Sequence, residues 1–166
     1  MPAATGNSAY LAIDQGTTSS RAILFNQQFE ILYTAQREFP QYYPKNGWVE
    51  QDPEELWQSV LNVAREALTV ASDLKLSVKH VGITNQRETT LVWNKESGQP
   101  VYNAIVWQDR RTAEICAVLK DAGSETMVME KTGLLLDPYF TATKLSWILN
   151  NVEGARIRAA AGLARL

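Results

Sequence analysis

Asp14-Gln15-Gly16-Thr17-Thr18-Ser19-Ser20-Arg21 follows directly on an apolar run at residues 10–13. An aspartate therefore stands at the end of an expected strand, and a glycine, four hydroxyl side chains and an arginine come after it. Gly16 allows a sharp turn and a close approach of the backbone to a ligand. The hydroxyl and backbone N–H groups can donate to phosphate oxygens, and Arg21 adds a fixed positive charge suited to the same oxygens. The octet therefore predicts a phosphate-binding loop.

Asp14 is the candidate metal ligand of this loop. Proteins usually hold Mg²⁺ with one or two carboxylates together with phosphate oxygens and water. The octet is neither a Walker A motif, which needs G-x-x-x-x-G-K-[ST], nor the dinucleotide motif G-x-G-x-x-G. We therefore expect a phosphate-and-metal loop of another kind.

Two other interpretations of the octet stay open at this point. Polar residues between apolar runs commonly form an ordinary hairpin turn. Asp-x-Gly-Thr also resembles one loop of an aspartic protease, in which two carboxylates share a proton. Residues 121–124 read Asp-Ala-Gly-Ser and could supply the second loop, but Asp121 closes a helical pattern rather than a strand.

Composition limits the classes of function. The chain has 166 residues, 45% of them hydrophobic and 20% charged, which is typical of a globular protein with one sizeable core. A net charge of −2 gives no electrostatic reason to expect nucleic acid as a partner, and no apolar run approaches membrane-spanning length. Cys116 is the single cysteine, so we expect a buried thiol and a cytoplasmic location. Residues 1–8 are expected to form a flexible tail.

The first half of the chain predicts an antiparallel meander followed by a helix and a fourth strand. The apolar runs are residues 10–13, 21–25 and 31–39, with short polar turns between them. A helix is expected to begin at Pro53, because Pro suits the first helical position after the N-cap Asp52. Its apolar stripe comprises Leu56, Val60, Ala64, Ala67, Leu68 and Ala71. The strand at residues 78–84 follows this helix and is expected to run parallel to the first strand.

The second half predicts a hairpin and three helices. The hairpin joins residues 89–93 to residues 100–106. Asp109 is expected to cap a helix that ends at Ala122-Gly123 and turns Ile115, Val118 and Leu119 inward. A short helix is expected at residues 127–130 and a longer one at 142–150, whereas residues 154–166 have no clear partner element. We therefore expect one N-terminal domain at residues 9–153.

This element order matches the ribonuclease-H-like α/β fold that actin, heat-shock and sugar-kinase ATPases share. The match consists of three strands, a helix and a fourth strand, with a polar loop between the first two strands. The chain lacks the remaining sheet strands of this fold, so we expect the domain to be incomplete, with one edge and one face of its core exposed. The fold hosts many functions and does not choose among them.

Four ordered blocks carry a more specific resemblance: residues 14–21 (DQGTTSSR), 85–89 (NQRET), 107–112 (WQDRRT) and 137–144 (DPYFTATK). Residues 47–53 (GWVEQDP) add to them. Together they resemble the N-terminal part of the FGGY family of carbohydrate kinases, over about residues 10–156. The second and fourth blocks resemble those members that phosphorylate glycerol.

The resemblance implies roles for individual residues. Nucleotide phosphates are expected at Thr17, Thr18, Ser19 and Arg21, with Asp14 orienting the Mg²⁺ shell, so Asp14 and Arg21 are the catalytic candidates. The substrate is expected at Thr17, Arg87, Glu88, Trp107 and Tyr139. Taken singly, the last four have simpler interpretations, because ion pairs and buried aromatic residues are common.

The resemblance also implies glycerol, ATP and ADP as ligands, Mg²⁺ as cofactor and a homo-oligomer for the full-length protein. The catalytic base and the second domain are expected beyond Leu166, so we expect the 166-residue polypeptide alone to be inactive. Two alternatives stay open: a kinase of the same family that acts on another polyol or a ketose, and a non-catalytic glycerol-binding module.

Overall fold

The chain forms two compact units, each built from two separate stretches of sequence. The structure, a computed structural model, describes residues 7–165. The first unit comprises Met1–Pro40 and Glu54–Gln86, and the second comprises Gln41–Pro53 and Arg87–Leu166. Residues 1–6 of the expected tail lie outside the described residues, and the first strand begins at Ser8. No helix within residues 7–165 has the length and apolar character needed to cross a membrane.

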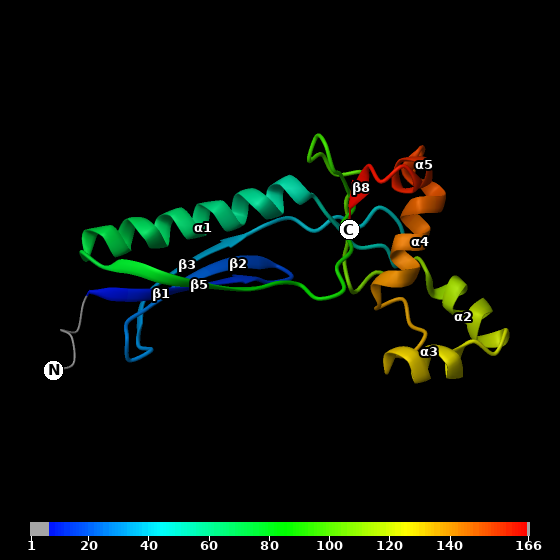
Figure 1. Ribbon diagram of the computed structural model, residues 1–166, viewed down its shortest axis with the longest axis horizontal. Helices are drawn as coiled ribbons and strands as arrows, with labels where there is room; N and C mark the ends of the chain where they lie inside the picture. The colour runs from blue at the N-terminus through cyan, green and yellow to red at the C-terminus, as the bar shows by residue number, and fades with distance from the viewer. Residues whose placement is uncertain (1–6, 166) are drawn as a thin grey trace. The chain divides into compact units, whose positions relative to one another are not determined.

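A four-stranded sheet forms the first unit (Figure 1). Its strands are β1 (Ser8–Gln15), β2 (Ser19–Phe25), β3 (Ile31–Glu38) and β5 (Ser77–Thr84), in the order β3-β2-β1-β5. β1 and β2 pair antiparallel, as do β2 and β3, whereas β5 runs parallel to β1. The predicted meander and the predicted parallel strand are both confirmed.

Helix α1 (Pro53–Asp73) covers one face of this sheet (Figure 1). Its inward positions are four residues apart, at Ser59, Val63, Ala67 and Ala71. The predicted stripe was therefore partly wrong: Leu68 is 45% exposed, and Val63 packs in the core instead. A serine fits the inward stripe because the Ser59 hydroxyl lies 2.7 Å from that of buried Ser20.

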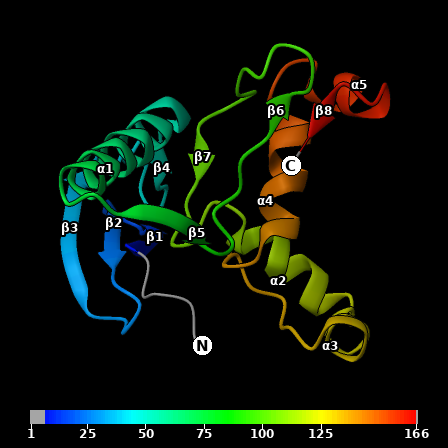
Figure 2. The ribbon, with the colours of Figure 1, turned by 60° about the vertical axis from the view of Figure 1, so that its left-hand side comes forward.

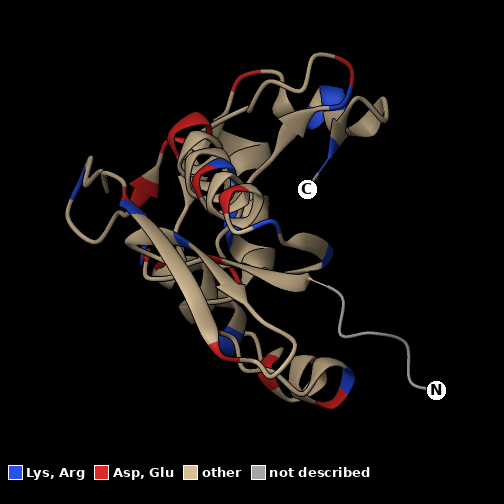
Figure 3. Ribbon diagram, turned by 90° about the vertical axis from the view of Figure 1, so that its left-hand side faces the viewer, with Lys and Arg blue, Asp and Glu red and all other residues tan. Residues whose placement is uncertain are grey.

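The charged residues of α1, which are acidic except for Arg65, lie outside its buried stripe (Figure 3). They include Glu54 and Glu55 in the first turn. Negative side chains at this end complement the partial positive charge of the helix N-terminus. The helix is therefore oriented by an apolar stripe on one side and solvated charges on the other.

β5 is an open edge of the sheet. Val81 and Ile83 pair with Leu11 and Ile13 of β1, so their side chains point to the face that α1 covers elsewhere. They are nevertheless 54% and 74% exposed. The expectation of an exposed edge is confirmed at β5, and the exposure of a face is seen only at these two residues.

The second unit combines short strands with four helices (Figure 2). β4 (Glu50–Gln51) pairs with β7 (Ala104–Ile105), and β6 (Trp93–Asn94) pairs with β8 (Ala164–Arg165). The helices are α2 (Ala113–Asp121), α3 (Glu125–Thr132), α4 (Thr141–Asn151) and α5 (Ala155–Ala160). Val92, Ile105 and Ile148 form its largest described core cluster.

The predicted hairpin is present only as isolated bridges. Thr90 bridges to Ile105 and Trp93 to Pro100. The regular strand pairs of these segments involve partners farther away in sequence: β7 pairs with β4, and β6 pairs with β8. Proline has no N–H to continue a ladder, which limits the hairpin at Pro100. The expectation that residues 154–166 lack a partner was wrong, because β8 pairs with β6.

The cap assignment at Asp109 was also wrong. α2 begins at Ala113, with Thr112 in the cap position, and Asp109 is fully buried. Cys116 is the buried residue of this helix, as expected, whereas Val118 is exposed. Burial raises the pKa of the Cys116 thiol. The helix ends where predicted, and α3 and α4 confirm the two later helices.

Candidate active site

The loop between β1 and β2 places Asp14 opposite Arg21. The two residues are partners in the strand register, and Arg21 Nε lies 3.7 Å from Asp14 Oδ2. Both side chains remain partly exposed, so both can reach a ligand. The turn closes through a 3.0 Å hydrogen bond from Gly16 N to Ser19 O. A Cβ on Gly16 would lie 3.0 Å from the same oxygen, which explains the glycine.

The hydroxyl residues of the loop differ in exposure. Thr18 is exposed and Thr17 is half-buried. The Ser19 side chain is buried and accepts a 3.0 Å hydrogen bond from Gln36 Nε2. The Ser19 hydroxyl therefore supports the loop from inside the protein. The phosphate contact assigned to Ser19 stays a prediction, and its backbone N–H could make that contact.

A side-chain hydrogen bond joins this loop to the end of β5. Gln86 Nε2 donates to Gln15 Oε1 over 3.1 Å. β1 and β5 are parallel and end together, since Asp14 pairs with Thr84. Ligands of open α/β sheets commonly bind at the carboxyl ends of such strands. The first unit therefore presents its polar loop where this architecture favours a ligand.

Glu88 is held in a strained backbone conformation in the second unit. Its φ angle is 66°, in the left-handed region that residues with a side chain rarely adopt. Its Oε2 accepts hydrogen bonds from Thr141 N (2.8 Å) and Thr141 Oγ1 (2.9 Å), at the start of α4. Strain of this kind clusters at ligand sites, where surrounding contacts maintain it.

Two aromatic residues of the predicted substrate set, Trp107 and Tyr139, pack on each other in the same unit. The rings of Trp107 and Tyr139 meet edge to face, with centroids 5.7 Å apart, and Tyr139 comes two residues before Thr141. The backbone N–H of Trp107 donates a hydrogen bond to Thr89 Oγ1 over 3.3 Å. Arg87 is exposed, and among the ion pairs of residues 7–165 none joins it to Glu88. The second unit therefore brings together the predicted substrate residues Glu88, Trp107 and Tyr139.

Lys144 is a buried cation that sequence reasoning did not single out. Its side chain is fully buried, and Nζ donates to the carbonyl oxygens of Pro138 (3.2 Å) and Tyr139. Burial lowers the pKa of Lys144 from its usual 10.5 to about 8, against an opposing effect of the negative charge of Glu88. Its place on the same helix face as Ile148, four residues on, was the available signal.

The shifted pKa of Lys144 predicts a pH dependence of stability. Between pH 8 and pH 10.5 the unfolded chain holds this proton more tightly than the folded chain, so the free energy of unfolding should rise with pH. The slope for one proton is at most about 1.4 kcal/mol per pH unit. Urea unfolding at pH 7.5, 8.5 and 9.5 should show this rise relative to Lys144→Met. Parallel pH profiles for the two proteins would contradict it.

Arg111 forms a second buried charge cluster in the same unit. It donates to Glu50 Oε1 (2.7 Å) and Asp109 Oδ2 (2.9 Å), and all three side chains are nearly inaccessible. Burial by itself lowers the pKa of Arg111, but the hydrogen bonds to Asp109 and Glu50 outweigh this effect and raise it. Asp109 also accepts a hydrogen bond from Val49 N.

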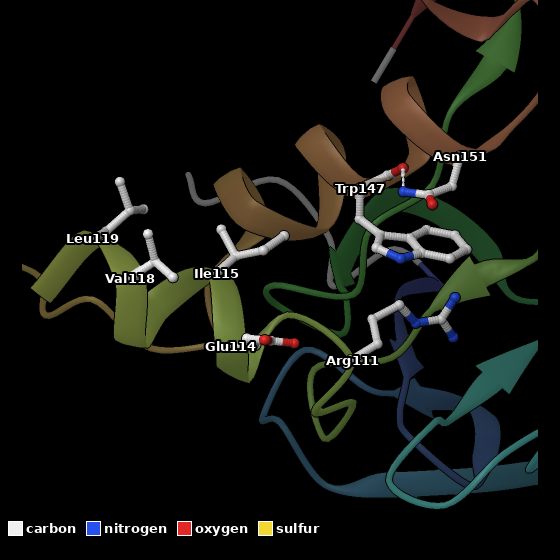
Figure 4. A pocket seen from close by; sticks show the side chains of 7 residues that line it. All are labelled: Arg111, Glu114, Ile115, Val118, Leu119, Trp147 and Asn151. Atoms are coloured by element: carbon white, nitrogen blue, oxygen red, sulfur yellow. Dashed lines mark hydrogen bonds between the residues drawn. The ribbon is translucent and has the colours of Figure 1, made fainter. Parts of the chain in front are cut away.

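Aromatic rings complete the surroundings of Arg111. Its guanidinium carbon lies 3.8 Å from the ring centre of Trp48 and 4.6 Å from that of Trp147. Figure 4 shows the guanidinium next to the Trp147 indole, beside a cavity of about 460 Å³. Three charged residues and two tryptophans from distant parts of the sequence thus stabilise the second unit, and local patterns do not reveal such a cluster.

Comparisons with known proteins identify the family of this chain. A sequence profile of the FGGY family of carbohydrate kinases, N-terminal domain, matches residues 9–164. Curated proteins called glycerol kinase from Rhodospirillum centenum and Ectopseudomonas mendocina are 59% identical over 152 residues and 61% identical over 155 residues. These alignments cover 92% and 93% of this chain, but 30% and 31% of the relatives.

Solved structures give the same result. The crystal structure of Plasmodium falciparum glycerol kinase with ADP matches with a TM-score of 0.89 and 32% identity, over 95% of this chain and 31% of that one. Xylulose kinase from Rhodospirillum rubrum, at 23% identity and a TM-score of 0.81 over 89% of this chain and 30% of that one, shares the fold. The expected sugar-kinase type of α/β fold is thereby confirmed. The chain spans about 30% of the length of the curated relatives it matches, and it belongs to the FGGY family of carbohydrate kinases.

Proposed function

We propose that this chain supplies the phosphate-binding loop and most of the substrate-binding residues of an ATP-dependent glycerol kinase, which forms glycerol 3-phosphate. The observation that carries the proposal is the Glu88 carboxylate, held by a strained backbone against the start of α4 in the unit that also pairs Trp107 with Tyr139. The glycerol kinases at 59% and 61% identity support this substrate over other carbohydrates.

The second unit has the chemistry that an uncharged triol requires. Glycerol offers hydroxyl groups that donate and accept hydrogen bonds, and a short carbon chain that packs on apolar surface. Glu88 accepts from Thr141 through Oε2, which leaves Oε1 for a substrate hydroxyl. Arg87 can donate to a neighbouring hydroxyl, Tyr139 adds a polar contact, and the Trp107 ring supplies the flat apolar face.

The first unit has the chemistry that phosphate requires. Phosphoryl transfer depends mainly on positioning and on neutralising charge. Thr17, Thr18 and the Ser19 backbone can donate to phosphate oxygens, and Arg21 provides positive charge. We propose Thr17 as a contact for both phosphate and substrate.

Asp14 suits a Mg²⁺ ion that is bound mostly by water and phosphate. Among residues 7–165 no group of three or more His, Cys, Asp or Glu side chains could hold a metal ion. A single, partly exposed carboxylate fits the usual coordination of Mg²⁺, which keeps several waters and shares few protein ligands. Such an ion, when bound, would neutralise charge on the transferred phosphoryl group.

We further propose that the base accepting the glycerol proton lies outside these 166 residues, that the full-length protein forms a homo-oligomer and that it works in the cytoplasm. The proposed boundaries of the N-terminal domain are residues 9 and 153.

A chimera tests the proposed function. This segment replaces the matching residues of the Ectopseudomonas mendocina glycerol kinase, which is 61% identical over 155 residues. We expect glycerol-dependent release of ADP, and none from the 166-residue polypeptide alone. Preferred turnover of a ketose by the chimera would reassign the substrate, and glycerol binding without turnover would favour a binding module.

Substitutions at Arg87 and Glu88 are expected to act on glycerol alone. In the chimera, Arg87→Ala and Glu88→Gln should each raise the glycerol KM about tenfold or more, because a charged hydrogen bond to a substrate hydroxyl is worth about 1.5–3 kcal/mol. The KM for ATP should stay within about twofold. Arg156→Ala, at an exposed position of the same unit, is the matched control. If Arg87→Ala weakened ATP binding and spared glycerol, its assignment would be reversed.

A further inference from the structure

Lys144 is an unusual buried cation because no carboxylate neutralises it directly. Among the ion pairs of residues 7–165 none includes Lys144, and its Nζ is satisfied by two backbone carbonyl groups. A buried charge is costly without close pairing, and its lowered pKa reflects that cost. A methionine would fill similar space without it. Packing alone therefore does not explain a lysine at this position.

The two carbonyl groups belong to the turn that leads into α4. In this turn Tyr139 N donates to Asp137 Oδ1 (2.8 Å), and Phe140 N donates to Asp137 O (3.1 Å). Thr141 N donates to the Glu88 carboxylate. The N–H groups of the turn are thus fixed by Asp137 and Glu88. Lys144 fixes its carbonyl side, one turn into the helix.

Through this turn Lys144 is linked to the residues proposed to contact glycerol, although it is not itself proposed to contact glycerol. Its hydrogen bond to the Tyr139 carbonyl sets the direction of a residue whose ring packs on Trp107. The same turn sets Thr141, whose N–H and hydroxyl orient Glu88. Loss of the Lys144 contacts would free Tyr139 and Glu88 together, since both depend on residues 138–141.

We propose that Lys144 is a positioning residue for the glycerol site, holding the turn at residues 138–141 so that Tyr139 and Glu88 keep the geometry that the substrate needs. The inference rests on the proposed function, because it names glycerol as the ligand of this site. Charged and titratable groups around Lys144 come from several elements: Glu88, Asp109, Asp137 and Cys116. The ammonium therefore also lies in the field of the carboxylate that it helps to place.

Kinetics of the chimera test this role. Lys144→Met should raise the glycerol KM about tenfold or more and leave the KM for ATP within about twofold, because only the turn that carries the glycerol contacts loses its support. The thermal midpoint should stay the same or rise, since a desolvated charge has been removed. Lys131→Met, at an exposed position in the last turn of α3, is the matched control and should change none of these values.

Hydrogen exchange provides a readout that does not depend on the reaction. In the chimera without ligands, Lys144→Met should speed exchange of the Tyr139, Phe140 and Thr141 amides about tenfold, while amides at residues 148–151 near the end of α4 stay protected. If the unsubstituted chimera failed to phosphorylate glycerol, the proposed function would fail, and exchange at these amides would still decide whether Lys144 holds the turn.

Several results would overturn the inference. One is unchanged exchange at residues 139–141 together with an unchanged glycerol KM. Another is a parallel rise of both KM values with faster exchange throughout α4, which would indicate a general loss of structure. If Lys144→Met and Lys144→Gln both failed to fold, judged by far-UV circular dichroism, Lys144 would be needed for folding rather than for positioning.

Discussion

Asp14→Asn in the chimera should lower kcat about 100-fold or more and leave the glycerol KM within about twofold. Asparagine keeps the size and one oxygen of Asp14 but removes the negative charge at the end of β1, beside the phosphate-type donors. Loss of one preorganised electrostatic group at a reacting centre typically costs about 100- to 1,000-fold in kcat. Steady-state kinetics with glycerol and ATP varied in turn would measure both effects.

Asp73→Asn is the matched control for this substitution, because Asp73 is an exposed aspartate at the end of α1 in the same unit. It should leave both parameters unchanged. If Asp14→Asn abolished glycerol binding while turnover at saturating glycerol persisted, Asp14 would belong to the substrate site and not to the metal and phosphate site.

Arg111→Met should destabilise the second unit by about 3–5 kcal/mol. The substitution leaves Glu50 and Asp109 buried without their shared cation, and removal of one partner from a buried ion pair typically has an effect of this size. Urea unfolding of the chain, followed by tryptophan fluorescence, would measure it. Trp48 and Trp147 lie against the Arg111 guanidinium and should report directly on the cluster.

Two further variants separate charge from packing. Arg156→Met, at an exposed site of the same unit, should change the free energy of unfolding little. Combining Arg111→Met with Glu50→Gln and Asp109→Asn should recover part of the loss, because the stranded charges are then gone. A triple variant less stable than Arg111→Met alone would show that hydrogen bonding by the carboxylates, rather than their charge, is decisive.

The first unit was largely predictable from sequence because its contacts follow local patterns. The alternating strands, the loop at residues 14–21 and the start of α1 at Pro53 each depend on neighbouring residues. The inward side of α1 was missed by about one position, because the apolar stripe did not include Ser59, whose hydroxyl is satisfied by a buried partner, Ser20. A partner 39 positions away cannot be read from a helical pattern.

The second unit was less predictable because distant segments define it. Its strands have two residues each, and their partners lie far away in sequence, as for β4 with β7 and β6 with β8. The motifs named Glu88, Trp107 and Tyr139, which lie in this unit, and their assignment to the substrate stays a prediction. Arg111 and Lys144 stand in the same motifs, but the sequence assigned neither of them a role. A charged residue inside a protein is recognisable only when its partners are known, and these partners come together through folding.

The backbone of Glu88 has a consequence for how this position can vary. Holding a residue with a side chain at φ 66° costs about 1–2 kcal/mol, whereas glycine adopts this conformation freely. Loss of the carboxylate from the start of α4 costs about 1 kcal/mol, so Glu88→Gly should be nearly neutral for folding. In a library of chimeras selected only for folding, glycine should therefore be tolerated at position 88 about as well as glutamate. Selection of the same library for growth on glycerol should restore glutamate, and persistence of glycine under that selection would argue against a role in catalysis or binding.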